Sequence, residues 1–113
     1  MRLTSDLWVK ALVRQVFSKG EFAVVERHGS PEAGAIFVRI LGRDGQQALL
    51  APAPQAIFDT AKPVDRTFET RLENCPGSEI DTILARERDF DPDFWVVEIE
   101  TENPQDYLTL MPA

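Results

Sequence analysis

The chain has 113 residues, of which 43% are hydrophobic and 27% charged, and this composition is typical of one soluble globular domain. Its net charge of −7 comes from the second half: residues 1–54 hold seven Lys and Arg against five Asp and Glu, and residues 55–113 hold five against fourteen. This acidity argues against nucleic-acid binding, and the lack of an apolar run of about 20 residues argues against a membrane span. With a single cysteine, Cys75, and no secretion signal, we expect a cytoplasmic protein.

The first predicted element is an amphipathic helix over residues 7–19, because apolar side chains recur there at helical spacing. Ser5 or Asp6 is expected to cap its start, and Gly20 to end it in a left-handed conformation. The polar side of this helix carries Lys10, Arg14 and Lys19. We interpret these three residues as a solvated face and not as a nucleic-acid patch.

After Gly20 the hydrophobic period changes from 3.6 to 2, which predicts strands. Residues 22–27 and 35–41 are expected to pair as an antiparallel hairpin, and Asp44-Gly45 to turn the chain into a third strand over 47–51. Prolines end that strand, and a loop with a short turn at 56–59 is expected to follow.

Alternation returns over residues 67–73 and predicts a half-solvated fourth strand. A second helix is expected over residues 78–89, with Ser78 and Asp81 resembling a capping box. Residues 95–100 then alternate as a fifth strand with one face in the core and the other mostly wet.

These elements predict a single α+β domain over residues 1–113, with residues 103–113 as a loosely attached tail. We expect an antiparallel sheet of about five strands, with both helices packed mainly on one face. The order of the strands stays open at this point.

Two segments resemble a known family. Glu32-Ala33-Gly34-Ala35-Ile36-Phe37-Val38 and the stretch from Arg88 to Glu100, RDFDPDFWVVEIE, are similar to segments of short bacterial proteins catalogued as a domain of unknown function. The resemblance extends over nearly the whole chain up to about residue 102. It implies a single domain and no particular activity, substrate or cofactor.

Carboxylates gather where the second helix is expected to meet the last strand. Asp89, Asp91, Asp93 and Glu100 have the spacing of calcium-loop positions one, three, five and twelve. Position six of such a loop requires glycine and is Phe94 here, so we predict a backbone turn and no metal site. Zinc is disfavoured as well, because the chain has one histidine and one cysteine.

Two further candidate sites remain as hypotheses. Arg86 and Arg88, with Asp89, Asp91 and Asp93, are candidates for binding a small anionic ligand. Cys75 precedes the second helix, where a helix dipole lowers a thiol pKa, but nothing in the sequence brings His28 beside it as a base.

The C-terminal segment contains apolar residues without an obvious place in the core: Tyr107, Leu108, Leu110 and Met111. They are expected either to add an edge strand to their own sheet, which we favour, or to offer that edge to another chain.

Because the groups for a recognised mechanism are missing or unpaired, we favour a non-catalytic binding or protein-interaction domain without a cofactor. Its expected partner is a protein or a second copy. The alternative is a small-ligand binder or enzyme that uses the Arg86–Asp93 cluster.

Overall fold

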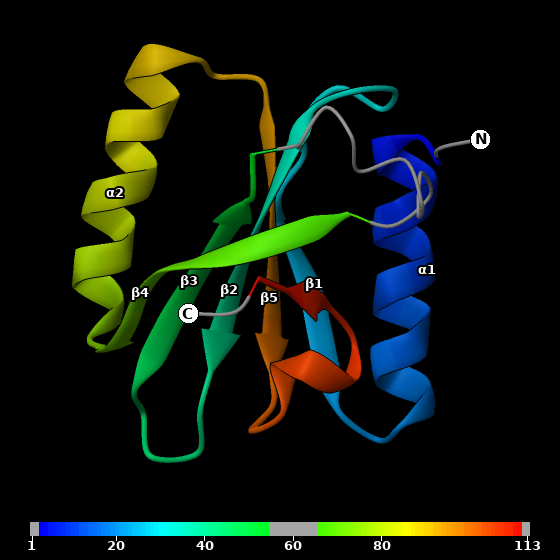
Figure 1. The fold of residues 1–113 in the computed structure, drawn as a ribbon, viewed down its shortest axis with the longest axis vertical. Helices are drawn as coiled ribbons and strands as arrows, with labels where there is room; N and C mark the ends of the chain where they lie inside the picture. Colours follow the sequence, from blue (N-terminus) through cyan, green and yellow to red (C-terminus); the bar gives the residue numbers. More distant parts are fainter. Residues whose placement is uncertain (1–2, 55–65, 112–113) are drawn as a thin grey trace.

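A six-stranded sheet of order β1-β5-β2-β3-β4-β6 runs through the computed structural model, which describes residues 3–54 and 66–111 (Figure 1). The sheet is mixed, since β5 is antiparallel to β1 but parallel to β2, and β6 is parallel to β4. The elements in chain order are α1 (Ser5–Ser18), β1 (Phe22–Arg27), β2 (Ala35–Leu41), β3 (Gln47–Pro52), β4 (Thr67–Cys75), α2 (Gly77–Phe90), β5 (Phe94–Glu100), a 3-10 turn (Pro104–Asp106) and β6 (Thr109–Leu110).

The expected α+β class is therefore confirmed, whereas the antiparallel sheet of five strands is only partly right. The β2–β3 and β3–β4 pairs are antiparallel as expected, and Gly45 takes a left-handed conformation with a φ of 84° in the β2–β3 turn. The short turn expected at residues 56–59 lies outside the described residues.

The predicted hairpin between the first two strands is wrong, because β5 lies between β1 and β2. The composition of β5 explains this position. Phe94, Trp95, Val96 and Val97 are all buried, so neither face of this part of the strand is wet. A run that is apolar on both faces is typical of a central strand with a parallel neighbour.

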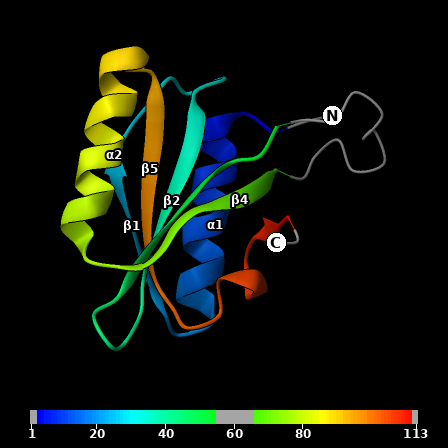
Figure 2. The same ribbon diagram turned by 60° about the vertical axis from the view of Figure 1, so that its left-hand side comes forward.

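The expectation that both helices pack on one face is also wrong, because α1 and α2 lie on opposite faces of the sheet (Figures 1 and 2). Successive strand residues point to opposite faces, so one strand supplies both cores. Ile36 and Val38 of β2 pack in the core with α1, and Phe37 between them packs in the core with α2.

The ends of α1 differ from the expectation at one terminus. Thr4 and not Ser5 or Asp6 caps the helix, its hydroxyl accepting a hydrogen bond from the Leu7 amide. Ser5 is fully buried and donates to the Gly34 carbonyl across the domain. Gly20 has a φ of 82°, the left-handed conformation expected after a helix.

The predicted capping box of α2 is wrong. Pro76 occupies the N-cap position, and no side chain caps this helix. Asp81 instead points across to β2, where it pairs with Arg39. The sequence spacing matched a local motif, but a cation from another element proved the stronger partner for this carboxylate.

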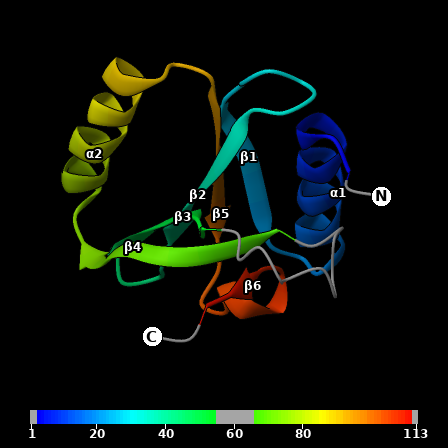
Figure 3. The ribbon, with the colours of Figure 1, turned by 45° about the horizontal axis from the view of Figure 1, so that its top comes forward.

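After β5 the chain passes around the end of the sheet, and its last described segment lies beside β4 (Figure 3). Leu108 is buried in the core with α1, and Leu110 pairs with Phe68 of β4. None of the helices in the described ranges has the length and apolar character needed to cross a membrane.

Candidate functional site

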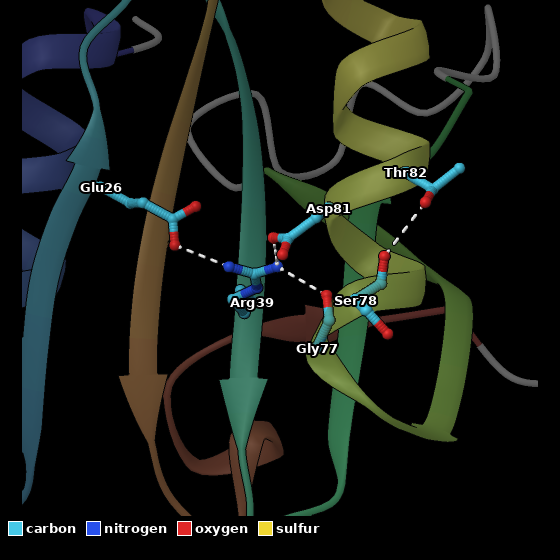
Figure 4. A network of polar contacts seen from close by, with 6 residues as sticks. All are labelled: Glu26, Arg39, Gly77, Ser78, Asp81 and Thr82. Carbon is cyan, nitrogen blue, oxygen red and sulfur yellow. Dashed lines mark hydrogen bonds and ion pairs between the residues drawn. The ribbon is translucent and has the colours of Figure 1, made fainter.

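Arg39 is a buried cation at the centre of the sheet face on which α2 lies (Figure 4). It is the charged residue of the otherwise apolar strand β2, and 8% of its surface is exposed. One terminal nitrogen donates to Glu26 of β1 at 2.9 Å, and the other donates to the Gly77 carbonyl at 3.2 Å and to Asp81. The guanidinium thus connects β1, β2 and the first turn of α2.

The charge of Arg39 is held by its partners. Burial disfavours the charged form, but the hydrogen bond to Asp81 and the negative charges of Glu26 and Asp81 raise the pKa of Arg39 above its ordinary value. Arg39 is therefore a permanent cation, and it acts as an electrostatic anchor and not as a proton donor.

A β-bulge in β1 allows Glu26 to reach this position. Val25 pairs with Val97 and Arg27 with Val96, so Glu26 is the extra residue opposite β5. Glu26 and Arg27 consequently both act on the α2 side: Glu26 bonds Arg39, while Arg27 lies 4.5 Å from the Phe94 ring centre and donates to the Pro92 carbonyl.

α2 covers only part of its sheet face. It packs with Leu49, Ala51 and the beginning of β5, whereas the part formed by β1 and the end of β5 has no described element over it. We call this surface the open half-face. It consists of Phe22, Val24, Glu26, Leu41, Glu98 and Glu100.

Two of these side chains are large, apolar and exposed. Phe22 and Val24 are 45% and 40% exposed, and they point to the same face because they are two residues apart on a strand. Phe17, at the end of α1, is 51% exposed and makes an edge-to-face contact with Phe22 at 5.6 Å. An apolar strip therefore follows the edge strand β1.

A hollow lies at each end of this face. One of about 700 Å³ is bordered by Phe22, Leu41, Arg43, Glu100 and Glu102, together with Gly20, Glu21, Gly42 and Thr101. The other, of about 290 Å³, lies between α2 and the end of β1 and is bordered by Glu26, Arg27, Asp81, Leu84, Ala85, Arg88, Phe94 and Val96. Glu98 lies between the hollows, because it follows Val96 and precedes Glu100 on the same side of β5.

Glu98 is a partly buried carboxylate whose charge is poorly supported. Burial raises its pKa, repulsion from Glu26 raises it further, and only the charge of Arg39 opposes these effects. The side chains of Glu98 and Glu100 form no hydrogen bond or ion pair with a described residue, and Arg39 is already engaged by Glu26 and Asp81. A perturbed carboxylate beside a hollow is a common feature of functional sites.

The predicted Arg86–Asp93 cluster is not brought together in one hollow. All five of its charged side chains are exposed, and only Arg88 borders one of the hollows described above. The side chains of Arg86 and Asp89 form no hydrogen bond or ion pair with a described residue.

Asp91 and Asp93 serve the backbone. An Asp91 oxygen accepts a hydrogen bond from the Asp93 amide, and an Asp93 oxygen accepts one from the Ser30 amide at 2.7 Å. The Trp95 indole donates to the Ser30 carbonyl. The acidic turn therefore joins the start of β5 to the loop before β2. Within the described ranges, no three Asp, Glu, His or Cys side chains are grouped so that they could hold a metal ion.

Cys75 and His28 lie on different sides of the sheet. Cys75 is buried in the core with α2, where burial raises the pKa of its thiol and its Sγ lies 3.5 Å from the Gln47 carbonyl oxygen. His28 contacts Trp95, which belongs to the core with α1. The structure therefore provides no Cys–His dyad from these two residues.

A family model described as "Protein of unknown function (DUF1491)" matches residues 3–109. The chain belongs to this DUF1491 family. The predicted membership of a family of unknown function is thus confirmed, and the matched region extends beyond residue 102. No curated protein matches the chain.

Solved structures of other proteins share the fold of this DUF1491 chain. The solution structure of protein Atu0922 from A. tumefaciens is similar with 50% identity and a TM-score of 0.88, covering 100% of this chain and 98% of its own. A crystal structure of a DUF1491 family protein from Caulobacter crescentus CB15 has 30% identity, a TM-score of 0.79, and coverage of 99% and 100%. An NMR structure of a DUF1491 family protein from the same organism has 30% identity, a TM-score of 0.78, and 99% coverage of both chains.

The C-terminal residues of this DUF1491 member are divided between core and surface. Leu108 is 5% exposed and Met111 is 46% exposed, while Leu110 is half-buried at the edge of the sheet. The Tyr107 hydroxyl donates to Glu21, which raises the pKa of Tyr107 to about 12 and lowers the pKa of Glu21. Thr101 also donates to Glu21, at 2.8 Å, so the segment is held on its own domain.

Sequence reasoning missed the centre of this DUF1491 surface. A charged residue inside an apolar strand, as Arg39 is in Ala-Ile-Phe-Val-Arg-Ile-Leu, is a usable signal, because a buried charge requires a partner. The partners Glu26 and Asp81 carried no such signal. They are ordinary surface carboxylates in the sequence, and only the bulge and the position of α2 bring them to Arg39.

Proposed function

We propose that this protein is a non-catalytic, cytoplasmic interaction domain that binds a protein partner on the open half-face. The observation that carries the proposal is the exposed apolar strip of Phe17, Phe22 and Val24 beside the edge strand β1. Adjacent exposed apolar side chains next to charged residues are typical of protein-binding surfaces.

The charged groups of this surface favour binding over catalysis. Arg39 is a permanent cation in an ion-pair network, and the thiol of Cys75 is buried away from His28. A catalytic mechanism would require a nucleophile or a proton carrier within hydrogen-bond reach of a base or of an orienting group.

The test is co-purification of the full chain, tagged and expressed at native level in its cell of origin. We expect the wild-type chain to retain a protein partner in a fixed stoichiometric ratio, and the Val24→Lys variant to lose it. Lysine is well tolerated on edge strands, so this change should leave the fold intact. Circular dichroism of the purified variant checks that expectation.

Phe90→Ser is the matched control, because Phe90 is 88% exposed but lies at the far end of α2. A partner that stays on the Phe90→Ser variant and leaves the Val24→Lys variant supports the proposal. Equal retention by both variants, or a wild-type chain that carries no protein, would contradict it.

A second candidate function is binding of a small anion, and it depends on Arg27 and Arg88 at the hollow between α2 and β1. Arginine suits anions because its planar fork binds two oxygens at once. Isothermal titration with inorganic phosphate tests this function. Binding that is lost in Arg88→Ala, with Arg86→Ala as the control, would favour it over a protein partner.

A further inference from the structure

We propose that the open half-face holds a basic amphipathic helix of a protein partner, with an apolar stripe over Phe22 and Val24 and with Lys or Arg side chains toward Glu98 and Glu100. This inference rests on the proposed function and specifies the partner's chemistry. It is carried by the size of the uncovered surface, by its charge and by the hollow at its end.

The uncovered surface has the dimensions of one helix. Strands lie about 4.8 Å apart, so the span from β1 across β5 to β2 is roughly 10 Å, close to the 10–12 Å diameter of a helix with its side chains. The five residues of β1 from Phe22 to Glu26 extend over about 16 Å, which corresponds to roughly eleven residues of helix. α2 already covers the other part of the same face, so a second helix beside it would complete the layer.

The charge that remains on this surface is negative. Glu26 and Asp81 are engaged by Arg39, and Arg27 is held by the Phe94 ring and the Pro92 carbonyl. Glu98 and Glu100 remain, and neither forms an ion pair within the described residues. A complementary partner surface therefore carries positive side chains, and these lie beside an apolar stripe.

The larger hollow provides a place for one cationic side chain. It is bordered by an exposed aromatic ring, Phe22, and by the carboxylates of Glu100 and Glu102. Arg43 and Glu21 border it as well, and the charge of Arg43 acts on Glu21, so the excess charge of the hollow is negative. Glu102 also accepts a hydrogen bond from the Arg43 amide, which holds its carboxylate at the rim. An aromatic face next to carboxylates is favourable for a Lys or Arg head group, because both attract a cation.

The environment of Glu98 agrees with this assignment. Glu26 of β1 and Glu100 of β5 face it with negative charge, and Arg39 of β2 is the cation on its other side. A partner ammonium or guanidinium over β5 would offset the repulsion between these carboxylates. The unbound domain therefore retains an electrostatic cost that binding removes.

A second copy of this chain is a poorer occupant. Its basic helix face, with Lys10 and Arg14 on α1, lies on the opposite side of the sheet from the open half-face. Docking α1 of one copy on the open half-face of the next would use two different surfaces, and such a contact repeats into an open polymer. A different protein that binds the open half-face gives a complex of defined size and no polymer.

The test uses the full chain in its cell of origin, with the photo-crosslinking residue benzoylphenylalanine in place of Val24, and with a second version that carries it in place of Phe90. After irradiation, mass spectrometry identifies the attached protein and the attached segment. We expect Val24 to give an adduct with a different protein, through a helical segment that has an apolar stripe and an excess of Lys and Arg.

The charge requirement is tested in the Val24 version with Glu98→Gln and Glu100→Lys together. We expect the adduct to fall on the order of tenfold, because opposite charges set the encounter rate and the register. Glu69→Gln together with Glu73→Lys is the control, since this pair makes the same charge change at a half-buried and an exposed position on β4. It should leave the adduct unchanged.

The other outcomes separate the two proposals. An adduct at Phe90 and none at Val24 overturns both this inference and the proposed function, which places the partner on the open half-face. An acidic or extended segment at Val24, or a second copy of this chain, overturns the inference and leaves an interaction function of the open half-face standing. No adduct at either position, together with no co-purifying partner, removes the proposed function and the inference with it.

Discussion

The two faces of the sheet are built differently. The face under α1 is apolar from β1 to β4, and it is closed by the helix and by Leu108 of the C-terminal segment. The face under α2 has a buried apolar core only beneath that helix, and beyond it lie Arg39, Glu26 and Glu98 beside the exposed side chains of Phe22 and Val24. We infer that the first face supplies most of the stability, and that the second leaves a surface available for recognition.

The largest effect is expected from Phe68→Ala on the α1 face. Phe68 is 1% exposed and its ring lies 5.6 Å from that of Trp8, so truncation leaves a cavity among buried side chains. We expect a loss of about 3–5 kcal/mol in the free energy of unfolding, measured by urea denaturation. Phe90→Ala, which removes an exposed ring, should cost less than about 0.5 kcal/mol. Equal effects would show that the α1 face is not the main source of stability.

A smaller effect is expected from Arg39→Ala on the α2 face. The change leaves Glu26 and Asp81 without their cation, and we expect a loss of about 2 kcal/mol in the same assay, since both carboxylates reach solvent and are partly rehydrated. Asp81→Ala should cost only about 0–1 kcal/mol, because the Asp81 side chain is 69% exposed. An Asp81→Ala loss as large as that of Arg39→Ala would mean that this pair is the essential link between α2 and β2.

The closure of the α1 face by the C-terminal segment depends on pH. The raised pKa of Tyr107, about 12, means that its contribution to stability is fully present below the ordinary tyrosine pKa near 10 and is lost as pH rises through about 12. Tyr107 is the single tyrosine, so the ultraviolet absorbance of tyrosinate reports on it alone. Circular dichroism at each pH confirms that the chain is still folded.

Glu21→Gln is the control for this titration, because it removes the charged acceptor of the Tyr107 hydrogen bond. We expect the Tyr107 midpoint to move down toward the ordinary value. A wild-type midpoint near 10 in the folded chain would show that the Glu21–Tyr107 contact is not maintained in solution.

The smallest expected effect is a gain in stability from Glu98→Gln. The folded-state pKa of Glu98 is raised, so its negative charge lowers the free energy of unfolding. This loss is absent below the ordinary glutamate pKa and develops as pH rises through the folded-state pKa. The variant should therefore have a higher melting temperature than the wild type at pH about 7, and the difference should disappear near pH about 4. A lower melting temperature at neutral pH would mean that Glu98 is stabilised by a favourable contact with Arg39.

Local structure could be predicted well from the sequence. The helix expected over residues 7–19 is found at Ser5–Ser18, and the helix expected over 78–89 is found at Gly77–Phe90. Gly20 and Gly45 have the expected positive φ. These features depend on side-chain periodicity and on backbone freedom, which neighbouring residues determine.

Long-range arrangement could not be predicted in the same way. The alternation of Trp95, Val97 and Ile99 predicts one buried face, although Phe94 and Val96 are buried on the other face as well. The site could not be predicted for the same reason, because Glu26, Arg39 and Glu98 come together only when β5 lies between β1 and β2. The β-bulge at Glu26 has no local sequence signal, since it arises from the pairing with a strand about 70 residues away.

The insertion of β5 also has a consequence for synthesis on the ribosome. β1 and β2 are both translated long before β5, yet each depends on β5 for its hydrogen-bonded neighbour at the middle of the sheet. The early part of the nascent polypeptide therefore has two strand edges and an unfinished interior until residues 94–100 leave the exit tunnel. Closure of the sheet should therefore be a late event in folding, because it requires pairing between segments that lie far apart in the sequence.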